Sequence, residues 1–281
     1  MRWDGWGLCM EPSTGSYRIL GRTGRVTSCP RAKTSTQTLL QWLNVTLNTT
    51  AFNDYCPNGL QVEGKPTISH IISGVTASQA LIDVAAQRQA DALLVHHGWF
   101  WKGEDPRILG TRKRRLAMLL AHDLNLMAFH LPLDAHPVLG NNAQLARVLG
   151  LVAEPITASN GLLWFGAMPG AVTLAEVARR VEQRLNRTPL VIGPEGLAIE
   201  RVAWCTGAAQ NMLSQAIEGG AQVFITGEVS EPTVHLAREA GVGFISAGHH
   251  ATERYGVQAL GQAIAQEFGI CVDFVDLDNP V

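Results

Sequence analysis

Residues 90–98 read ADALLVHHG, and this stretch decides how the sequence around it is interpreted. An apolar run over residues 92–95 ends at His96, His97 and Gly98. Short apolar runs between helical segments are typical of buried strands in a parallel α/β sheet that is covered on both faces. Adjacent strand residues point to opposite faces, so both imidazoles can reach one site only where the strand stops, and Gly98 permits that turn.

The same order of elements occurs twice along the chain. Residues 70–129 predict strand, helix, strand, helix, strand, and residues 202–246 predict the same order again. In each copy the last strand is followed by polar groups, HLPLDAH at 130–136 and GHHATER at 248–254. An internal repeat of this kind predicts two similar units. We therefore expect an α/β fold made of two similar domains.

The expected domains are residues 36–158 and residues 159–281, each an α/β unit, with folded structure beginning near Thr36. Residues 1–35 have no helical or strand period, and six basic residues there outnumber two acidic ones. We interpret this segment as a disordered tail, or as non-native sequence added by an upstream start codon. An organelle transit peptide, which would also be basic and poor in acids, is the alternative.

The composition argues against several classes of protein. Hydrophobic residues make up 46% of the chain, which excludes global disorder. The 22 basic and 24 acidic residues give a net charge of −2, so nucleic-acid binding is not expected. The basic run at 112–115 is interpreted as a solvated helix start, with DNA association as the alternative. No apolar stretch is long enough to span a membrane. The five cysteines are scattered without a C-x-x-C pair, which argues against a disulfide framework and a thiolate zinc site, so we expect free, mostly buried thiols of a cytoplasmic protein.

Histidines and carboxylates gather where the predicted strands end, and open α/β sheets bind ligands at that edge. His249 and Glu253 lie one turn apart if a helix begins there, and His250 competes for the same role. Asp134 offers an oxygen ligand from a segment that Pro132 is expected to keep extended. Taken singly, each group also fits a structural role in a loop or at a helix start. Together these nitrogen and oxygen donors suit Zn, Mn, Fe or Ni.

An aromatic run follows the first histidine pair. We interpret Trp99, Phe100 and Trp101 as core or interface residues, and the alternative is that they wall a pocket or stack a base. Lys102 and Arg254 are interpreted as surface charges, with a contact to a phosphate as the alternative.

Several ordered motifs resemble one protein family. They are residues 54–62, 95–103, 130–136, 226–228 and 248–254. The family is that of the GTP cyclohydrolase 1 type 2 homologues, also called Ngg-one-interacting-factor-three-like, and the resemblance extends from about Thr36 to Val281. It implies a two-domain α/β subunit with a dinuclear metal centre in the cleft between the domains, assembled into a hexameric ring.

The resemblance also implies the ligands of two divalent metal ions. His97 and Asp134 would bind one ion, His96 and His249 the other, and Glu253 both. The expected function is a metal-dependent hydrolase of a purine nucleotide or related small molecule, in which activated water attacks a carbon such as C8 of guanine.

His130 or His250 is expected to transfer the proton in this reaction. The alternative function is a metal-handling or scaffold protein without turnover, because no motif specific for a nucleotide is visible.

Overall fold

The computed structural model describes residues 7–10, 17–20, 32–155, 161–170 and 172–281. The chain forms two compact units: unit 1 comprises Met1–Pro132 and Val257–Asp278, and unit 2 comprises Leu133–Gly256 and Asn279–Val281. The sequence placed the division near residue 158 instead, which would assign Asp134 to the first domain. The difference arises because the segment after Asp134 packs into the core of unit 2, while the last strand returns to unit 1.

The sheet of unit 1 has five strands. In spatial order they are β17 (Cys271–Phe274), β6 (His70–Thr76), β7 (Ala92–His97), β8 (Asn125–Ala128) and β4 (Gly59–Val62). The first four strands run parallel, and β4 pairs antiparallel with β8. Residues 92–96 of β7 are all buried, as expected for a strand that is covered on both faces.

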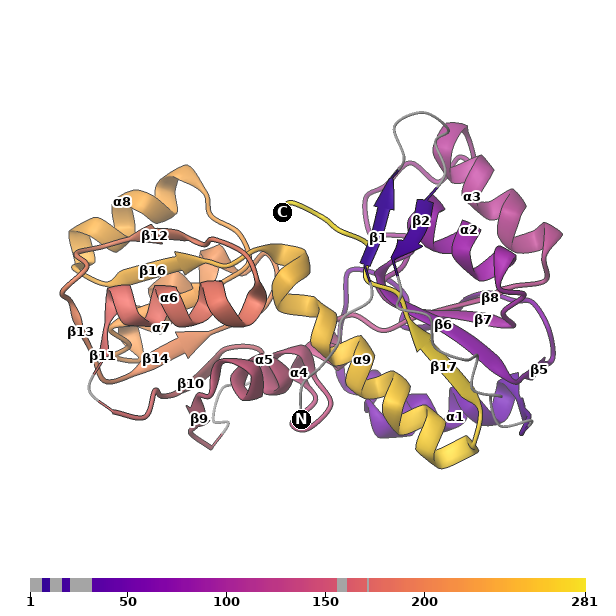
Figure 1. The fold of residues 1–281 in the computed structure, drawn as a ribbon, viewed down its shortest axis with the longest axis horizontal. Helices are drawn as coiled ribbons and strands as arrows, with labels where there is room; N and C mark the ends of the chain where they lie inside the picture. Colours follow the sequence, from indigo (N-terminus) through magenta and orange to yellow (C-terminus); the bar gives the residue numbers. More distant parts are fainter. Residues whose placement is uncertain (1–6, 11–16, 21–31, 156–160, 171) are drawn as a thin grey trace. The chain divides into compact units, whose positions relative to one another are not determined.

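Helices cover both faces of this sheet (Figure 1). They are α2 (Gln79–Gln87) and α3 (Gly110–Ala121) on one face, and α1 (Thr36–Thr46) with the C-terminal part of α9 (His249–Phe268) on the other. Helix α1 begins at Thr36, near which folded structure was expected to start, and the Ser35 side chain caps it by accepting a hydrogen bond from the Thr38 backbone N–H at 3.0 Å. Trp42 of α1 contacts Phe268 of α9 edge to face, with ring centroids 5.7 Å apart.

The main sheet of unit 2 has six strands. In spatial order they are β12 (Leu190–Ile192), β16 (Gly243–Ser246), β15 (Val223–Thr226), β14 (Val202–Trp204), β10 (Trp164–Ala167) and β9 (Val152–Ala153). Strands β14, β15 and β16 are parallel, and the outer strands are antiparallel to their neighbours. Two short antiparallel pairs complete the strands of the folded units: β3 (Thr34–Ser35) with β5 (Thr67–Ile68) in unit 1, and β11 (Val172–Thr173) with β13 (Ala198–Ile199) in unit 2.

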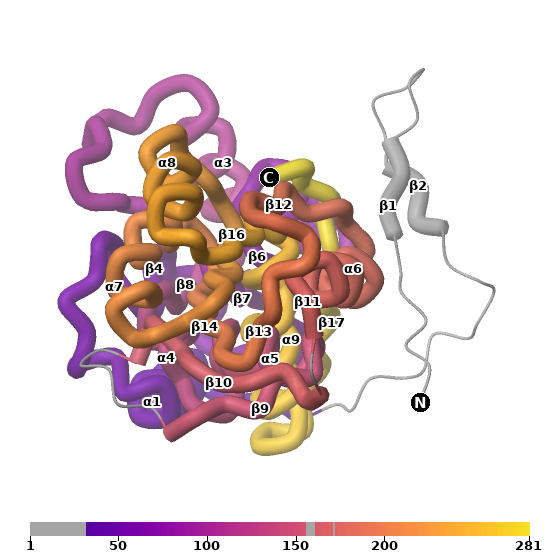
Figure 2. The backbone as a smooth tube through the Cα atoms, turned by 90° about the vertical axis from the view of Figure 1, so that its left-hand side faces the viewer, coloured from indigo at the N-terminus to yellow at the C-terminus, as the bar shows by residue number. Residues whose placement is uncertain are grey.

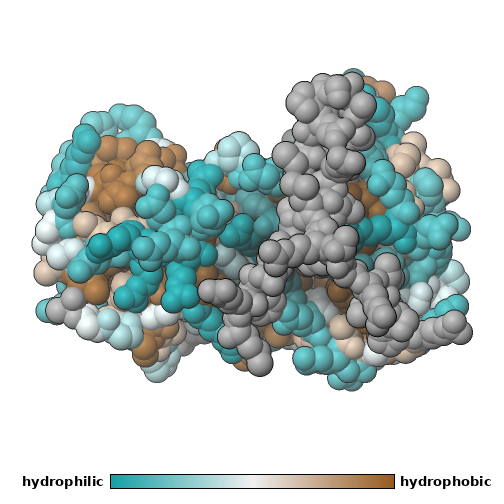
Figure 3. Space-filling model, viewed as in Figure 1, coloured by the Kyte–Doolittle hydropathy of each residue, from teal (hydrophilic) through white to brown (hydrophobic). Residues whose placement is uncertain are grey.

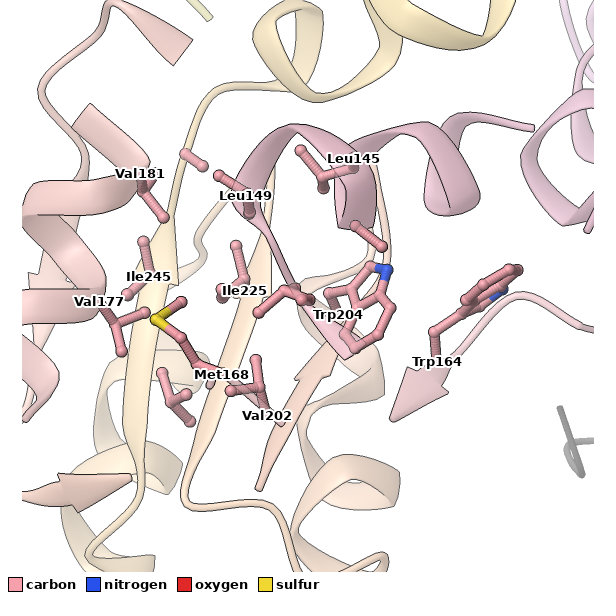
Figure 4. Close-up of a cluster of buried hydrophobic side chains, with 14 of the residues drawn as sticks. Leu145, Leu149, Trp164, Met168, Val177, Val181, Val202, Trp204, Ile225 and Ile245 are labelled. Atoms are coloured by element: carbon pink, nitrogen blue, oxygen red, sulfur yellow. The ribbon is translucent and has the colours of Figure 1, made fainter. Parts of the chain in front are cut away.

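The core of unit 2 lies between this sheet and two helices, α5 (Asn141–Leu149) and α6 (Leu174–Leu185). In Figure 4, Leu145 and Leu149 of α5 and Val177 and Val181 of α6 point toward the central strands, among whose labelled residues are Val202, Ile225 and Ile245. Helices α7 (Leu213–Glu218) and α8 (Glu231–Ala240) lie side by side (Figure 2). Both units therefore carry buried parallel strands whose carboxyl ends are available for a site.

The mixed α/β fold is confirmed, with two corrections. The outer strands β4, β9, β10 and β12 are antiparallel, whereas the apolar runs predicted parallel sheets. Residues 131–135 form a short helix, α4 (Leu131–Ala135), instead of an extended segment. Proline is tolerated in the first turn of a helix because the N–H that it lacks has no intrahelical partner there.

The predictions for the cysteines and the tail have mixed outcomes. Cys56 and Cys205 are free and buried, as expected, but Cys271 is disulfide-bonded, so the prediction of free thiols is wrong for this residue. Within the predicted tail, β1 (Gly7–Met10) and β2 (Tyr17–Leu20) pair antiparallel. The prediction for residues 1–6, 11–16 and 21–31 lies outside the described residues.

The face of the molecule drawn in Figure 3 is mostly hydrophilic, with smaller hydrophobic areas. One of these areas overlies the part of unit 2 that carries α8 and β12, and Leu190 and Val191 of the edge strand β12 are exposed. Within the described ranges, no helix is both long enough and apolar enough to cross a membrane.

Candidate metal centre

Three histidines of unit 1 converge at the carboxyl ends of β7 and β8. His96 and His97 are the last residues of β7, and His130 follows β8. Each offers a ring nitrogen within 4.8 Å of those of the other two. The ring centroid of His96 lies 4.5 Å from that of His97 and 5.1 Å from that of His130. The end of the strand therefore brings both members of the His96–His97 pair to one place, together with a third imidazole.

The backbone fixes which nitrogen of His96 carries the proton. His96 is fully buried, and its Nδ1 lies 3.0 Å from the carbonyl oxygen of Phe129. A carbonyl only accepts, so Nδ1 donates, and a neutral ring then carries its lone pair on Nε2. This second interaction is the one that commonly orients histidine ligands of metals. His97 has a related contact, with Nδ1 3.3 Å from the hydroxyl of Thr76.

A buried carboxylate holds His130. Oδ1 of Asp54 lies 2.7 Å from Nδ1 of His130 and accepts the backbone N–H of Tyr55, while Oδ2 accepts hydrogen bonds from Asn58 and from the N–H of Leu131. Burial raises the pKa of Asp54, but the hydrogen bonds from His130 and Asn58 and the His130 charge outweigh it and lower the pKa to about 2. Asp54 is therefore an anion at neutral pH. The sequence placed it in a motif without assigning it a role.

Unit 2 holds a second cluster, in which His249 lies between two carboxylates. Its Nδ1 is 2.6 Å from Oε1 of Glu228, and its Nε2 is 3.0 Å from Oε2 of Glu253, one turn along α9 as predicted. Burial lowers the pKa of His249, but Glu253 and Glu228 overcome this effect and raise the pKa to about 9. A carboxylate on the far nitrogen is the usual partner of a metal-binding imidazole. Glu228, like Asp54, belonged to a motif but had no predicted role.

Asp134 lies in the same unit and is buried. Its Oδ1 accepts hydrogen bonds from the side chains of Asn141, at 2.8 Å, and Thr206, at 3.2 Å. A carboxylate oxygen of Asp134 also lies within 4.8 Å of one of Glu253. Burial raises the pKa of the nearby Cys205 thiol well above its ordinary value, and the charges of Asp134 and Glu253 raise it further. The thiol is therefore protonated at neutral pH in the metal-free protein.

A glycine makes room for the ligand atoms of unit 2. A Cβ atom at Gly207 would lie 2.0 Å from Oε1 of Glu253 and 3.2 Å from Nε2 of His249, and the positive φ of +68° also favours glycine. Imidazole nitrogen and carboxylate oxygen form a donor set that suits Zn, Mn, Fe or Ni. The donor atoms of unit 2 thus fit a divalent transition-metal ion in their chemistry.

The other predicted residues have distinct surroundings. His250 follows His249 in α9, and its backbone N–H donates to the carbonyl of Val281 at 3.0 Å. Arg254 is predicted to be a surface charge, but it donates to the carbonyl of Leu185 and its guanidinium lies over the ring of Tyr255. Its position on α9 therefore has a structural explanation.

Comparisons with known proteins agree with the motifs. The family model of Duf34/NIF3 (NGG1p interacting factor 3) matches residues 34–280. A Neisseria meningitidis serogroup A protein named GTP cyclohydrolase 1 type 2 homolog is 53% identical over 241 residues, which cover 86% of this chain and 97% of that protein. A Pseudomonas aeruginosa protein of the same name is 52% identical over 246 residues, with coverage of 86% and 97%.

Solved structures show the same fold. Protein ybgI, described as of unknown function, superposes with a TM-score of 0.85 at 50% identity, covering 88% of this chain and 100% of that one. A protein from Thermus thermophilus superposes with a TM-score of 0.78 at 36% identity, covering 88% and 99%. These matches confirm the resemblance drawn from the motifs. The chain belongs to the Duf34/NIF3 (NGG1p interacting factor 3) family.

Proposed function

We propose that this protein is a dinuclear metal-dependent hydrolase that acts on a purine nucleotide or a related small molecule. The proposed ligands of two divalent ions (Zn, Mn, Fe or Ni) are His96, His97, Asp134, His249 and Glu253. The observation that carries the proposal is the position of His249, with Glu228 at one ring nitrogen and Glu253 at the other. That arrangement fits an imidazole ligand with its orienting carboxylate and a neighbouring carboxylate ligand.

Two divalent ions, when bound, would lower the pKa of water and polarise a substrate oxygen. The chain's own residues would prepare the site in three ways. The Phe129 carbonyl fixes the proton of His96 on Nδ1, and Glu228 does the same for His249. Asp54 holds Nδ1 of His130, which leaves Nε2 of that ring to exchange a proton with the substrate or with water. His250 is the second proposed proton-transfer residue.

The proposal includes the architecture that the family resemblance implies. Strands β6, β7 and β8 have the same order and direction as β14, β15 and β16, which supports an internal repeat. Assembly into a six-chain ring is part of the same proposal, and light scattering on the purified protein tests it. A mass of one or two chains in solution would contradict the ring.

Turnover by the metal-loaded protein tests the function. GTP consumption and product formation would be followed by chromatography for wild type and for Glu253→Gln, which removes a ligand charge with little change of shape. We expect turnover by wild type and its loss in Glu253→Gln. Glu231→Gln is the matched control, because Glu231 also contacts a histidine four residues away in a helix, at 2.8 Å, but on the exposed surface of α8.

Two outcomes would contradict the proposed hydrolase. One is equal turnover by wild type and Glu253→Gln. The other is reversible transfer of metal to an apo-enzyme without turnover of GTP or of a screened set of amides and phosphoesters, and that result would favour the metal-handling alternative.

A further inference from the structure

Two aromatic side chains of unit 1 flank the histidine cluster. The ring centroid of Trp101 lies 4.9 Å from that of His130 and 6.0 Å from that of His97, and Tyr55 approaches His130 from 6.3 Å. The Trp101 and His130 rings are nearly perpendicular, at 86°, and the Trp101 and His97 rings are inclined at 57°. Neither contact is a face-to-face stack. The indole therefore stands at the cluster without being stacked on either imidazole.

The three aromatic residues after the histidine pair differ sharply in burial. Trp99 is 7% exposed, and its indole N–H donates to the carbonyl of Ala77 at 3.0 Å, so it is a core residue as the sequence indicated. Trp101 is only half-buried, and Tyr55 is 62% exposed. Hydrophobic burial within the chain thus accounts for Trp99 but not for the position of Trp101 and Tyr55.

The backbone is held in an unfavourable conformation to place Trp101. Phe100 has a φ of +65°, which is a genuine outlier for a bulky residue. The turn is fixed on both sides: the Trp99 N–H donates to the side chain of Gln61 at 2.7 Å, and the Lys102 N–H donates to the carbonyl of Tyr55 at 2.7 Å. Strain of this kind persists where the surroundings impose it, and it is frequent at ligand sites.

We infer that Trp101, with Tyr55 beside it, is a stacking subsite for a planar heteroaromatic ring of the ligand. The inference rests on the proposed function in taking the histidine cluster as the place where the ligand reacts. Aromatic side chains stack on any nucleic-acid base, because every base has a π face. Nε2 of His130, next to the indole, can form a hydrogen bond with a nitrogen or oxygen atom at the edge of such a ring, because Asp54 holds the other ring nitrogen.

Binding of two probes that share a sugar phosphate tests this subsite. Guanosine 5′-monophosphate carries a planar base, and ribose 5-phosphate does not. Calorimetry would measure the dissociation constant of each probe for the protein, both loaded with metal and stripped of it. We expect wild type to bind guanosine 5′-monophosphate about tenfold or more tightly than ribose 5-phosphate, in line with the usual cost of deleting a stacked aromatic side chain.

Variants of Trp101 would test whether its indole causes the preference for guanosine 5′-monophosphate. Trp101→Ala should remove the preference for guanosine 5′-monophosphate, and Trp101→Phe should keep most of it because a phenyl ring still stacks. Tyr55→Ala should reduce it in part. Leu120→Ala is the control, since Leu120 is 57% exposed on α3 and belongs to no aromatic contact of the cluster. Melting temperatures of all variants would verify that each is folded.

The outcomes separate this inference from the proposed function. A folded Trp101→Ala protein that keeps the wild-type preference overturns the subsite, as does wild-type protein that binds both probes equally or does not bind guanosine 5′-monophosphate at millimolar concentration. Elemental analysis of the same samples reports on the metal centre independently. Protein that takes up no metal on reconstitution but still shows a Trp101-dependent preference would refute the hydrolase and keep the subsite.

Discussion

The carboxylate of Asp54 and the imidazole of His130 form a nearly buried pair, with Oδ1 2.7 Å from Nδ1 and side-chain exposures of 3% and 14%. The two residues are 76 positions apart in the chain, and the N–H groups of Tyr55 and Leu131 donate to the same carboxylate. Because both oxygens of Asp54 accept hydrogen bonds, the carboxylate joins the segment before β4 to the segment after β8. The pair therefore stabilises unit 1 and orients His130 at once.

Asp54→Asn should destabilise the protein. The NH₂ group of an asparagine would face N–H groups that now donate hydrogen bonds to the carboxylate. Leaving a buried donor without an acceptor costs about 1–3 kcal/mol of stability. We expect the melting temperature to fall by roughly 4–8 °C, taking a loss of about 2 kcal/mol. Asp83→Asn is the control, because Asp83 accepts a hydrogen bond from Gln79 four residues away within α2. Equal melting temperatures for the two variants would contradict this account of Asp54.

Gly207→Ala should weaken metal binding by at least about tenfold, because the new methyl group would occupy the space next to Glu253 and His249. The matched control is Gly241→Ala. Gly241 has the same φ of +68°, but a Cβ atom there would meet nothing within 4 Å. Titration of both apo-proteins with Zn²⁺ would separate backbone strain, which they share, from the clash at the ligands. If both variants bind Zn²⁺ equally, Gly207 has no special role in the metal site.

Glu228→Gln should also weaken metal affinity, by about 10–100-fold, because loss of an orienting carboxylate has this effect at other histidine ligands. Competition with a chelator of known affinity would measure it. Glu231→Gln, which alters an exposed glutamate–histidine pair of the same spacing as His249–Glu253, should leave the affinity unchanged. A loss of the same size in both variants would argue for a general effect of charge.

Asp91 should make the stability of unit 1 depend on pH. Burial raises the pKa of Asp91, but hydrogen bonds from Lys65, Ser69 and the backbone of His70 prevail and lower it. A folded-state pKa below the unfolded value of about 3.9 gives a stabilisation that is present above that pH and is lost as the pH falls through the folded-state value. Asp91→Asn should therefore lower the melting temperature at pH 7.

The difference between wild type and Asp91→Asn should shrink as the pH falls below about 4, where the wild-type carboxyl becomes protonated. Melting curves of both proteins between neutral and acidic pH would measure this trend. A difference that stays constant over the whole range would show that the charge of Asp91 contributes nothing.

Local sequence patterns predicted the parts of the fold that depend on neighbouring residues. The apolar runs identified β6, β7 and β8, and folded structure was expected to begin near Thr36, where α1 begins. Strand β17 was missed because its position depends on pairing with β6, in which Cys271 lies opposite His70. Such pairing of segments some 200 residues apart leaves no local period, and the division into units depends on it.

The candidate site shows the same contrast. His249 and Glu253 were predicted as neighbours because helical spacing places them one turn apart, and their atoms lie 3.0 Å apart. Asp54 and Glu228 were not assigned because a carboxylate that contacts a histidine through tertiary structure looks like any other acidic residue in the sequence. The role of Gly207 could not be predicted either. The side-chain atoms for which it leaves room belong to a helix that begins 42 residues further along the chain.

Elemental analysis of the purified, metal-reconstituted protein tests the central claim most directly. The account predicts about two transition-metal ions per chain for wild type, and fewer for Glu253→Gln but not for Glu231→Gln. Wild-type protein that retains no metal after dialysis, or Glu253→Gln protein that retains as much as wild type, would contradict it.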